Sequence, residues 1–274
     1  MPEISIGYLG PTGTFCEIAA ENLFPKHHLD PYPNILSVIE ALAQGHLTTG
    51  VLPMENLLEG TVTPVLDGLT SYPNIIISGE VLIKIEHHLM VSPGSRKKQL
   101  TGIFSHPHAL AQCQEYLRKN FFHLPCQPLS STAEAARRVA LDLNSCAAIG
   151  NKRAAEIYGL EILERNIGDA NENYTRFIVL TKEIPEPTGK DKTSIAFSLE
   201  HKPGTLSNTL VSFAQAGINL TKIESRPSRK VMGEYIFYVD FEGHVQDLPV
   251  KEVLKEVRKH TTYLSVMGSY PRNC

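Results

Sequence analysis

One stretch of this 274-residue sequence separates two different patterns of predicted strands and helices: Glu183-Ile184-Pro185-Glu186-Pro187-Thr188-Gly189-Lys190-Asp191-Lys192. Two prolines, a glycine and dense charge are typical of an exposed linker. We therefore expect a first domain over residues 1–182, a linker over 183–192 and a second domain over 193–274. The length agrees, because at about 150 residues per domain it predicts roughly two domains.

Upstream of the linker, short β-branched runs alternate with helical patterns, from a strand at residues 4–9 to a strand at residues 176–181. Between them we expect, among other elements, a polar turn at residues 54–56 and a single helix at residues 108–120. This alternation indicates an α/β fold with parallel sheets covered on both faces. Residues 75–90 are long and β-rich, so we expect them to cross between two lobes. Ligands of such folds bind where loops leave the carboxyl ends of the strands.

Downstream of the linker the order of elements changes. The predicted elements are a strand at 194–199, a helix at 206–216, strands at 219–225 and 235–242, a helix at 250–260 and a strand at 264–270. This order, βαββαβ, is the ferredoxin-like unit.

Composition excludes several classes of protein. The chain has 26 basic and 29 acidic residues, for a net charge of −3, and a non-specific nucleic-acid binder needs a basic surplus. No apolar run approaches the roughly 20 residues that span a bilayer. The first residues have no basic flank and apolar core of a signal peptide. We therefore expect a cytoplasmic protein.

Cysteines and histidines give no sign of a metal site. The five cysteines, an odd number without a C-x-x-C pair, are Cys16, Cys113, Cys126, Cys146 and Cys274. Neither a disulfide framework nor structural zinc is expected from this pattern. The histidine doublets are adjacent residues, which point to opposite faces of a strand. We expect no metal and no cofactor.

The first candidate site follows the first strand, at Gly10-Pro11-Thr12-Gly13-Thr14-Phe15. Backbone N–H groups at a helix start, beside threonine hydroxyls, suit a carboxylate or phosphate. The glycines do not have the spacing of a dinucleotide fingerprint, and no Walker lysine follows. From these residues alone, an anion site and a tight turn before a capped helix are equally good interpretations.

Two further candidates follow strands. Glu55 and Asn56 come directly after a buried strand, where a loop over a cleft would place them, although Asn56 could instead cap a helix. Ser105 and His106 stand before Pro107, which opens a helix. Either residue could cap that helix, and the histidine could equally bind an anion.

The fourth candidate is Thr175-Arg176-Phe177, at the start of the last strand of the first domain. The arginine could bind a carboxylate through two hydrogen bonds while the threonine hydroxyl donates another. An edge strand whose arginine points outward is the alternative. No Ser-His-Asp order, nucleophile elbow or kinase signature joins these four candidates.

In order along the chain, these segments resemble the prephenate dehydratase family with a C-terminal ACT domain, and the resemblance covers essentially the whole chain. Further motifs that carry it are Ala109-Leu110-Ala111-Gln112-Cys113, Ala154-Ala155-Glu156-Ile157-Tyr158-Gly159-Leu160 and Glu224-Ser225-Arg226-Pro227. The sequence departs from the family at Leu57, His108, Asn151 and Thr205, where serine, glutamine, serine and alanine are usual.

The resemblance implies a two-lobed, periplasmic-binding-protein-like catalytic domain that converts prephenate to phenylpyruvate, water and carbon dioxide without a cofactor. The catalytic residues that it implies are Thr175, Arg176, Phe177, Glu55, Asn56, Ser105 and His106. The substrate-binding residues are Thr12, Gly13, Thr14 and Phe15. In this interpretation Thr175 donates to the leaving hydroxyl, while Arg176, Thr12 and the amides near Gly13 hold carboxylates.

For the tail, the resemblance implies feedback inhibition by L-phenylalanine in a homo-oligomer, a dimer or a dimer of dimers. The effector-binding residues that it implies are Gly204, Thr205, Leu206, Asn219, Leu220, Glu224, Ser225, Arg226 and Pro227. Two other functions stay open at this point. The substrate could be arogenate, or the chain could be a non-catalytic two-lobed ligand-binding protein with an amino-acid sensor.

Overall fold

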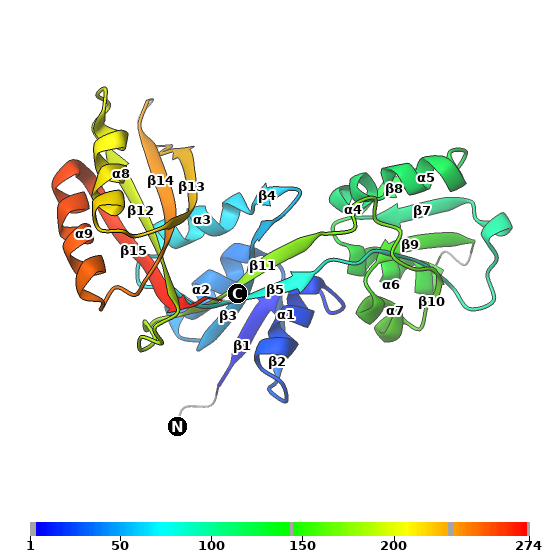
Figure 1. Ribbon diagram of the computed structural model, residues 1–274. Coiled ribbons are helices and arrows are strands. Elements are labelled where there is room, and N and C mark those ends of the chain that lie inside the picture. The colour runs from blue at the N-terminus through cyan, green and yellow to red at the C-terminus, as the bar shows by residue number, and fades with distance from the viewer. Residues whose placement is uncertain (1–3, 143–144, 230–232, 273–274) are drawn as a thin grey trace. The chain divides into compact units, whose positions relative to one another are not determined.

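The computed structural model describes residues 4–142, 145–229 and 233–272 (Figure 1). Cys274, one of the cysteines discussed above, lies outside these residues. The described residues fall into two compact units: unit 1 draws on Met1–Val38, Val51–Val65 and Val81–Phe177, and unit 2 on Ile39–Gly50, Leu66–Glu80 and Ile178–Cys274. Each unit is described separately.

Most elements of the first 182 residues belong to unit 1. They are β1 (Ile6–Leu9), α1 (Phe15–Leu23), β2 (Leu29–Tyr32), β4 (Gly60–Thr61), β6 (His88–Val91), the 3-10 helix η1 (Lys97–Gln99), β7 (Gly102–Ser105), α4 (Pro107–Gln112), α5 (Gln114–Phe121), β8 (Cys126–Pro128), α6 (Thr132–Asp142), β9 (Cys146–Gly150), α7 (Lys152–Tyr158) and β10 (Glu161–Glu164). Five elements contribute residues to both units: α2 (Ile35–Gln44), β3 (Thr49–Asn56), α3 (Thr63–Ser71), β5 (Ile76–Lys84) and β11 (Tyr174–Thr181).

Unit 1 contains two sheets. One runs in the order β5-β11-β3-β1-β2, with β1 and β2 parallel, and the other in the order β10-β6-β9-β7-β8. In the second sheet β7 is parallel to β8 and β9, whereas β6 is antiparallel to β9 and β10.

The alternation of side chains along β9 explains why helices cover both faces of the second sheet. Ala147 and Ile149 pack in one hydrophobic cluster with residues of α4 and α5, and Cys146 and Ala148 pack in another with residues of α6 and α7. Figure 1 shows these two helix pairs on opposite faces of the sheet. Successive strand residues point to opposite faces, so a strand that is apolar throughout needs a cover on each side.

Unit 2 holds the elements of the tail: β12 (Asp191–Leu199), α8 (Thr205–Gln215), β13 (Leu220–Pro227), β14 (Tyr235–Glu242), α9 (Leu248–His260) and β15 (Thr261–Pro271). The antiparallel order β13-β14-β12-β15 is that of a ferredoxin-like βαββαβ unit. At Gly268, β15 pairs with Ile77 of β5, and any Cβ there would collide with the Ile77 carbonyl. Only glycine fits this approach.

The α/β fold class and the ferredoxin-like tail are confirmed, and several local predictions are wrong. Residues 54–56, expected as a polar turn, continue strand β3. The single helix expected at residues 108–120 breaks at Cys113, which separates α4 from α5. Asp191, expected in an exposed linker, begins β12 and is buried, and its carboxylate accepts hydrogen bonds from the amides of Thr188 and Gly189. Within the described ranges, no helix is both long and apolar enough to cross a membrane.

Candidate functional site

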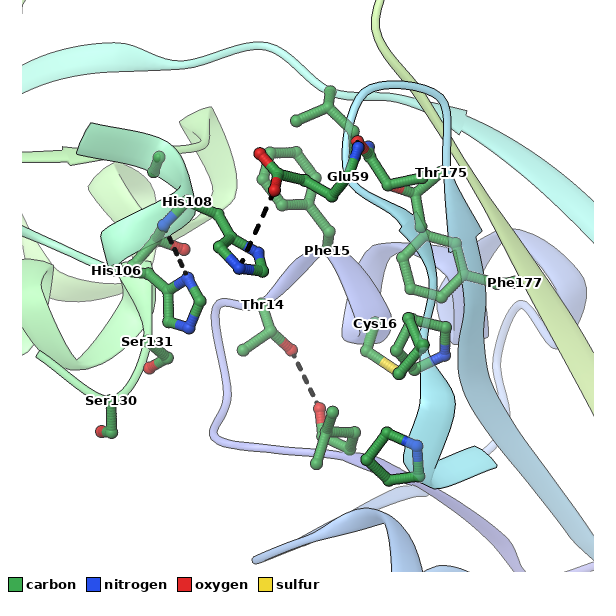
Figure 2. Close-up of a pocket in the computed structure, with 18 of the residues that line it drawn as sticks. Thr14, Phe15, Cys16, Glu59, His106, His108, Ser130, Ser131, Thr175 and Phe177 are labelled. Carbon is green, nitrogen blue, oxygen red and sulfur yellow. Dashed lines mark hydrogen bonds and ion pairs between the residues drawn. The ribbon is translucent and has the colours of Figure 1, made fainter. Parts of the chain in front are cut away.

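A cavity of about 590 Å³ lies within unit 1. This volume is in the range of small-molecule sites. Its wall includes the end of β1, the start of α1, the segment after β3 and the starts of α3, α4 and α6. In Figure 2, His106, Ser130 and Ser131 lie to the left of the open space and Thr175, Phe177 and Cys16 to the right.

Asn56 fixes the hydroxyl of Thr175 in this wall. The side-chain oxygen of Asn56 accepts hydrogen bonds from the backbone N–H groups of Leu58 (3.0 Å) and Glu59 (3.1 Å). Its amide nitrogen must therefore face the other way, where it donates to Thr175 Oγ1 at 2.9 Å and to Asn173 Oδ1 at 2.8 Å. Because Thr175 Oγ1 accepts this hydrogen bond, its own O–H remains available to donate a hydrogen bond to a ligand.

Arg176 does not reach the cavity, contrary to the expectation that it binds a substrate carboxylate. Thr175 and Phe177 line the cavity, and Arg176 between them belongs to the other face of β11 because strand residues alternate. Arg176 is 5% exposed, and its Nη1 lies 3.4 Å from Glu55 Oε1. Glu55 is likewise absent from the described wall, so this pair joins β3 to β11 instead of meeting a ligand.

The loop before α1 is divided between two roles. Thr14 and Phe15 line the cavity, and Thr14 caps α1 by accepting a hydrogen bond from the amide of Glu17. Thr12 and Gly13 do not line it, contrary to expectation. The amide of Gly13 donates to the Glu17 carboxylate, which occupies the position expected for a ligand carboxylate.

Two side chains at the two ends of α7 hold the backbone of the loop before α1. The Thr12 carbonyl accepts a hydrogen bond from the Tyr158 hydroxyl at 2.9 Å, and the Gly13 carbonyl accepts one from Asn151 Nδ2 at 2.9 Å. Asn151 Oδ1 also caps α7 through the amide of Ala154. Asparagine at this departure from the family pattern therefore keeps a capping role.

His106 lines the cavity and caps α4 at the same time. Its Nδ1 accepts a hydrogen bond from the backbone N–H of His108 at 3.3 Å, so the ring carries its proton on Nε2. Burial lowers the pKa of His106, which favours the neutral ring. Ser105, in contrast, is fully buried and donates to the Ile149 carbonyl at 2.6 Å. This hydrogen bond joins β7 to β9, so the Ser105 hydroxyl stabilises the sheet and does not face the cavity.

The described wall offers neutral hydrogen-bond donors and one carboxylate, that of Glu59, and no cationic lysine or arginine. Helices α1, α3 and α6 each begin at the wall, and their N-termini carry partial positive charge. Nor do three or more His, Cys, Asp or Glu residues form a metal-binding group in the described parts of the chain. The arrangement suits an anion held by hydroxyls, amides and helix ends.

Several lining residues were missed from the sequence, chiefly Gln112, His87, Glu59, Ser130 and Ser131. Gln112 had a usable signal, because it follows Ala109 by one helical turn on the same face of α4. Its Nε2 donates to Glu59 Oε1 at 3.1 Å, and His108 Nε2 lies 3.9 Å from Glu59 Oε2 (Figure 2). The serines precede α6, and Ser131 caps it through the amide of Glu134.

The predicted effector residues of unit 2 do not form one pocket in a single chain. Gly204 adopts a left-handed conformation (φ +86°) before α8, and Thr205 and Leu206 line a hollow of about 80 Å³ with residues 199–202, Gly233, Tyr235 and Phe237. Asn219, Leu220, Glu224, Ser225 and Pro227 lie outside that hollow, in or beside β13. Arg226 binds Asp67 of α3, with Nη1 and Oδ1 3.1 Å apart.

Family models match nearly the whole described chain. The model for prephenate dehydratase matches residues 6–185, and the model for the ACT domain matches residues 193–259. The chain belongs to the prephenate dehydratase family. As a family member, it combines a prephenate dehydratase region with a C-terminal ACT domain, as the sequence resemblance predicted.

Curated relatives of this prephenate dehydratase family member resemble it over almost its full length. The bifunctional chorismate mutase/prephenate dehydratase of Pseudomonas aeruginosa is 40% identical over 98% of this chain and 73% of the relative. The prephenate dehydratase of Methanocaldococcus jannaschii is 40% identical over 96% of this chain and 97% of the relative.

Two solved structures are also similar to this family member. A prephenate dehydratase from Arthrobacter aurescens in complex with L-Phe has a TM-score of 0.91, with 34% identity over 98% of this chain and 90% of that one. A protein described as GqqA, a novel type of quorum quenching acylase, has a TM-score of 0.89, with 29% identity over 98% of both chains.

Proposed function

We propose that this chain is a prephenate dehydratase that makes phenylpyruvate from prephenate. The bond from the ring to its carboxylate breaks and releases carbon dioxide, its electron pair moves into the ring, and the hydroxyl opposite leaves. The departing hydroxide takes up one proton and becomes water. Aromatisation drives the reaction, so the protein has to bind, orient and supply a hydrogen-bond donor, with no electron sink required.

The hydrogen bond from Asn56 to Thr175 carries this proposal. It directs the Thr175 proton away from Asn56, and in the proposal this proton is donated to the departing hydroxyl. A threonine hydroxyl is too weak an acid to give up its proton outright, so Thr175 orients or relays a proton. Phe177 beside it supplies an apolar surface for the ring. In this assignment Arg176, Glu55 and Ser105 support the wall, and Asn56, His106, Thr14 and Phe15 contact the substrate.

The composition of the wall suits a doubly charged ligand. Prephenate has two carboxylates and a keto group, which accept hydrogen bonds, and one hydroxyl. His106 Nε2–H, the hydroxyls of Ser130 and Ser131 and the N-terminus of α6 supply donors. Donors that are already oriented lose little entropy when they bind an anion, which supports recognition without a guanidinium.

The similar structure described as a quorum quenching acylase raises acyl-amide hydrolysis as an alternative activity, and the chemistry of Cys16 disfavours it. Its thiol donates to the Val51 carbonyl at 3.1 Å, and burial raises its pKa to about 12. A thiol in this state is a poor nucleophile. Ser105 is fully buried and bonded to a backbone carbonyl, so it is no better candidate.

For regulation, we propose a catalytic domain at residues 1–182, a linker at 183–192 whose last two residues already belong to β12, and an ACT domain at 193–274 that binds L-phenylalanine and inhibits the enzyme. A hollow of about 80 Å³ is smaller than the pockets that enclose small ligands, which supports an effector site completed by a second copy of the chain. The homo-oligomer would then be part of the effector site. Isothermal calorimetry with L-phenylalanine, together with light scattering, tests this proposal, and no heat of binding would reject it.

The deciding experiment incubates purified protein with prephenate, with arogenate and with an N-acyl amide in separate reactions. Phenylpyruvate from the first reaction supports the proposal, and phenylalanine from the second reaction alone would make the enzyme an arogenate dehydratase. Carboxylic acid release only in the third would favour hydrolase chemistry. Ligand binding without turnover would favour the non-catalytic alternative.

Thr175 provides a direct test of the assignment within that assay. Removing a preorganised donor costs about 2.7–4 kcal/mol, so we expect Thr175→Ala to lower kcat by about 100-fold or more. Thr175→Ser keeps the hydroxyl and should retain much of the activity. Turnover by Thr175→Ala near that of the unmodified protein would show that another group assists the departing hydroxyl.

A further inference from the structure

His87 is a buried side chain that only half uses its hydrogen-bonding capacity. It lies between β5 and β6, is 4% exposed and lines the cavity. Its Nε2 lies 2.9 Å from Gln112 Oε1, and its Nδ1 is buried without a partner among the described residues. Its ring packs edge-to-face with Phe15, with centroids 5.9 Å apart.

The contacts of Gln112 determine which ring nitrogen of His87 carries the proton. Gln112 Nε2 donates to the carboxylate of Glu59, which can only accept. The oxygen of the Gln112 amide must then face the other way, where it accepts from Asn173 Nδ2 at 3.0 Å and from His87 Nε2. Burial lowers the pKa of His87, so the ring is neutral and Nδ1 has no hydrogen.

An unpaired buried acceptor costs folding free energy, and it calls for an explanation. An apolar side chain of similar size would avoid that cost, and the neighbouring Phe15 ring would pack against it equally well. The other nitrogen of His87 supplies the explanation, because it is bound to a residue of the cavity wall.

We infer that His87 is a positioning residue, which holds the Gln112 oxygen away from the ligand so that the Gln112 amide presents an N–H to a dianion. The inference rests on the proposed function. One N–H of this group bonds to Glu59, and the second has no partner among the described residues. With the amide reversed, an oxygen would face the substrate carboxylates and repel them. Asn173 and Glu59 hold the amide in the same orientation from its two ends.

Variants at position 87 separate this role from a structural one. His87→Leu removes both nitrogens, and we expect kcat/KM for prephenate to fall by about 10- to 100-fold, the effect of one lost hydrogen bond to a charged group. Its melting temperature should equal or exceed that of the unmodified protein, because the unpaired acceptor is gone. His87→Gln retains an N–H that can reach Gln112 and should recover most of the activity. His87→Phe repeats the test with a ring, in case the leucine variant does not fold.

The adjacent His88 is the matched control. It is equally buried, but it belongs to the opposite face of the chain, and its Nδ1 accepts a hydrogen bond from the Asn166 amide at 3.1 Å. We expect His88→Leu to lower the melting temperature and to leave kcat/KM of the folded protein unchanged. The His87→Leu variant should therefore lose activity without losing stability, and the His88→Leu variant should lose stability without losing activity.

A double-mutant cycle with Gln112→Ala completes the test. If His87 acts through Gln112, then adding His87→Leu to Gln112→Ala should lower kcat/KM by less than about twofold. Full additivity of the two losses, or a His87→Leu variant with unchanged kcat/KM, would overturn the inference. Failure of the proposed function is a separate result, since in that case the unmodified protein itself would not convert prephenate.

Discussion

The substitution Asn56→Asp changes the direction of one hydrogen bond while almost preserving the shape of the side chain. One oxygen of the new carboxylate can still accept from the amides of Leu58 and Glu59. The other replaces Nδ2 and meets Thr175 Oγ1 at 2.9 Å, Asn173 Oδ1 at 2.8 Å and the Tyr174 carbonyl at 3.2 Å. In the orientations that the structure shows, only the Thr175 hydroxyl among these three groups can donate a hydrogen bond to the new carboxylate oxygen.

Thr175 would therefore turn its O–H toward the carboxylate and away from the cavity. Loss of one preorganised donor corresponds to about 2.7–4 kcal/mol in the transition state, which is a fall in kcat of about 100- to 1,000-fold. Asn173 Oδ1 also loses its donor, whereas the Tyr174 carbonyl keeps the hydrogen bond from the Leu57 amide at 2.9 Å. The loss of the Asn173 hydrogen bond costs about 1–3 kcal/mol, so we expect the free energy of unfolding to fall as well.

The assay follows phenylpyruvate formation at a temperature where circular dichroism shows the variant to be folded. We expect a large fall in kcat for Asn56→Asp. We also expect Asn56→Asp to add less than about threefold to the effect of Thr175→Ala, since both act on the same hydroxyl. A kcat for Asn56→Asp within about fivefold of the unmodified protein would refute this reasoning, and so would losses that simply multiply in the double variant.

Three further predictions follow from buried groups. Arg176→Ala should lower the free energy of unfolding by about 1–3 kcal/mol, because it removes the ion pair with Glu55. It should leave KM for prephenate nearly unchanged. A tenfold rise in KM would show that the Arg176 guanidinium does contact the substrate. Burial lowers the pKa values of His87 and His88 in the folded protein, so below the unfolded histidine pKa of about 6.5 the unfolded chain binds more protons than the folded one. The melting temperature should therefore fall as the pH drops through this value. A melting temperature that stays constant between pH 7.5 and 5.5 would contradict these pKa shifts. Iodoacetamide at pH 8 should leave Cys16 unmodified in the folded protein, as mass spectrometry of the digested chain can check, and rapid labelling would show a reactive thiolate.

The sequence predicts much of the fold because its signals are local. Apolar periodicity, Pro107 at the start of α4 and the charged stretch before β12 each act over a few residues. Boundaries fail where tertiary contacts decide. Residues 54–56 look polar and turn-like, yet they extend β3 because Glu55 and Asn56 pair with the two residues of β4.

The site was predictable only in part, for the same physical reason. The triplet Thr175-Arg176-Phe177 indicates a functional strand, and the period of two then allows only alternate residues to face one side. The expectation that Thr175 and Arg176 act together therefore conflicts with strand geometry. Gln112 and His87 lie 25 residues apart and bond to each other, a contact that no local pattern encodes.

The lack of a lysine or arginine in the described wall also has a consequence for release of the product under the proposed function. The reaction removes one carboxylate as carbon dioxide, so the product is bound by fewer hydrogen bonds than the substrate. Each hydrogen bond to a charged group contributes about 1.5–3 kcal/mol, and its loss weakens binding by roughly 10- to 150-fold. A guanidinium inside the cavity would oppose this release, because loss of its carboxylate would leave a buried charge unpaired. Keeping Arg176 on the opposite face of β11, paired with Glu55, lets the same donors bind the dianion and release the monoanion.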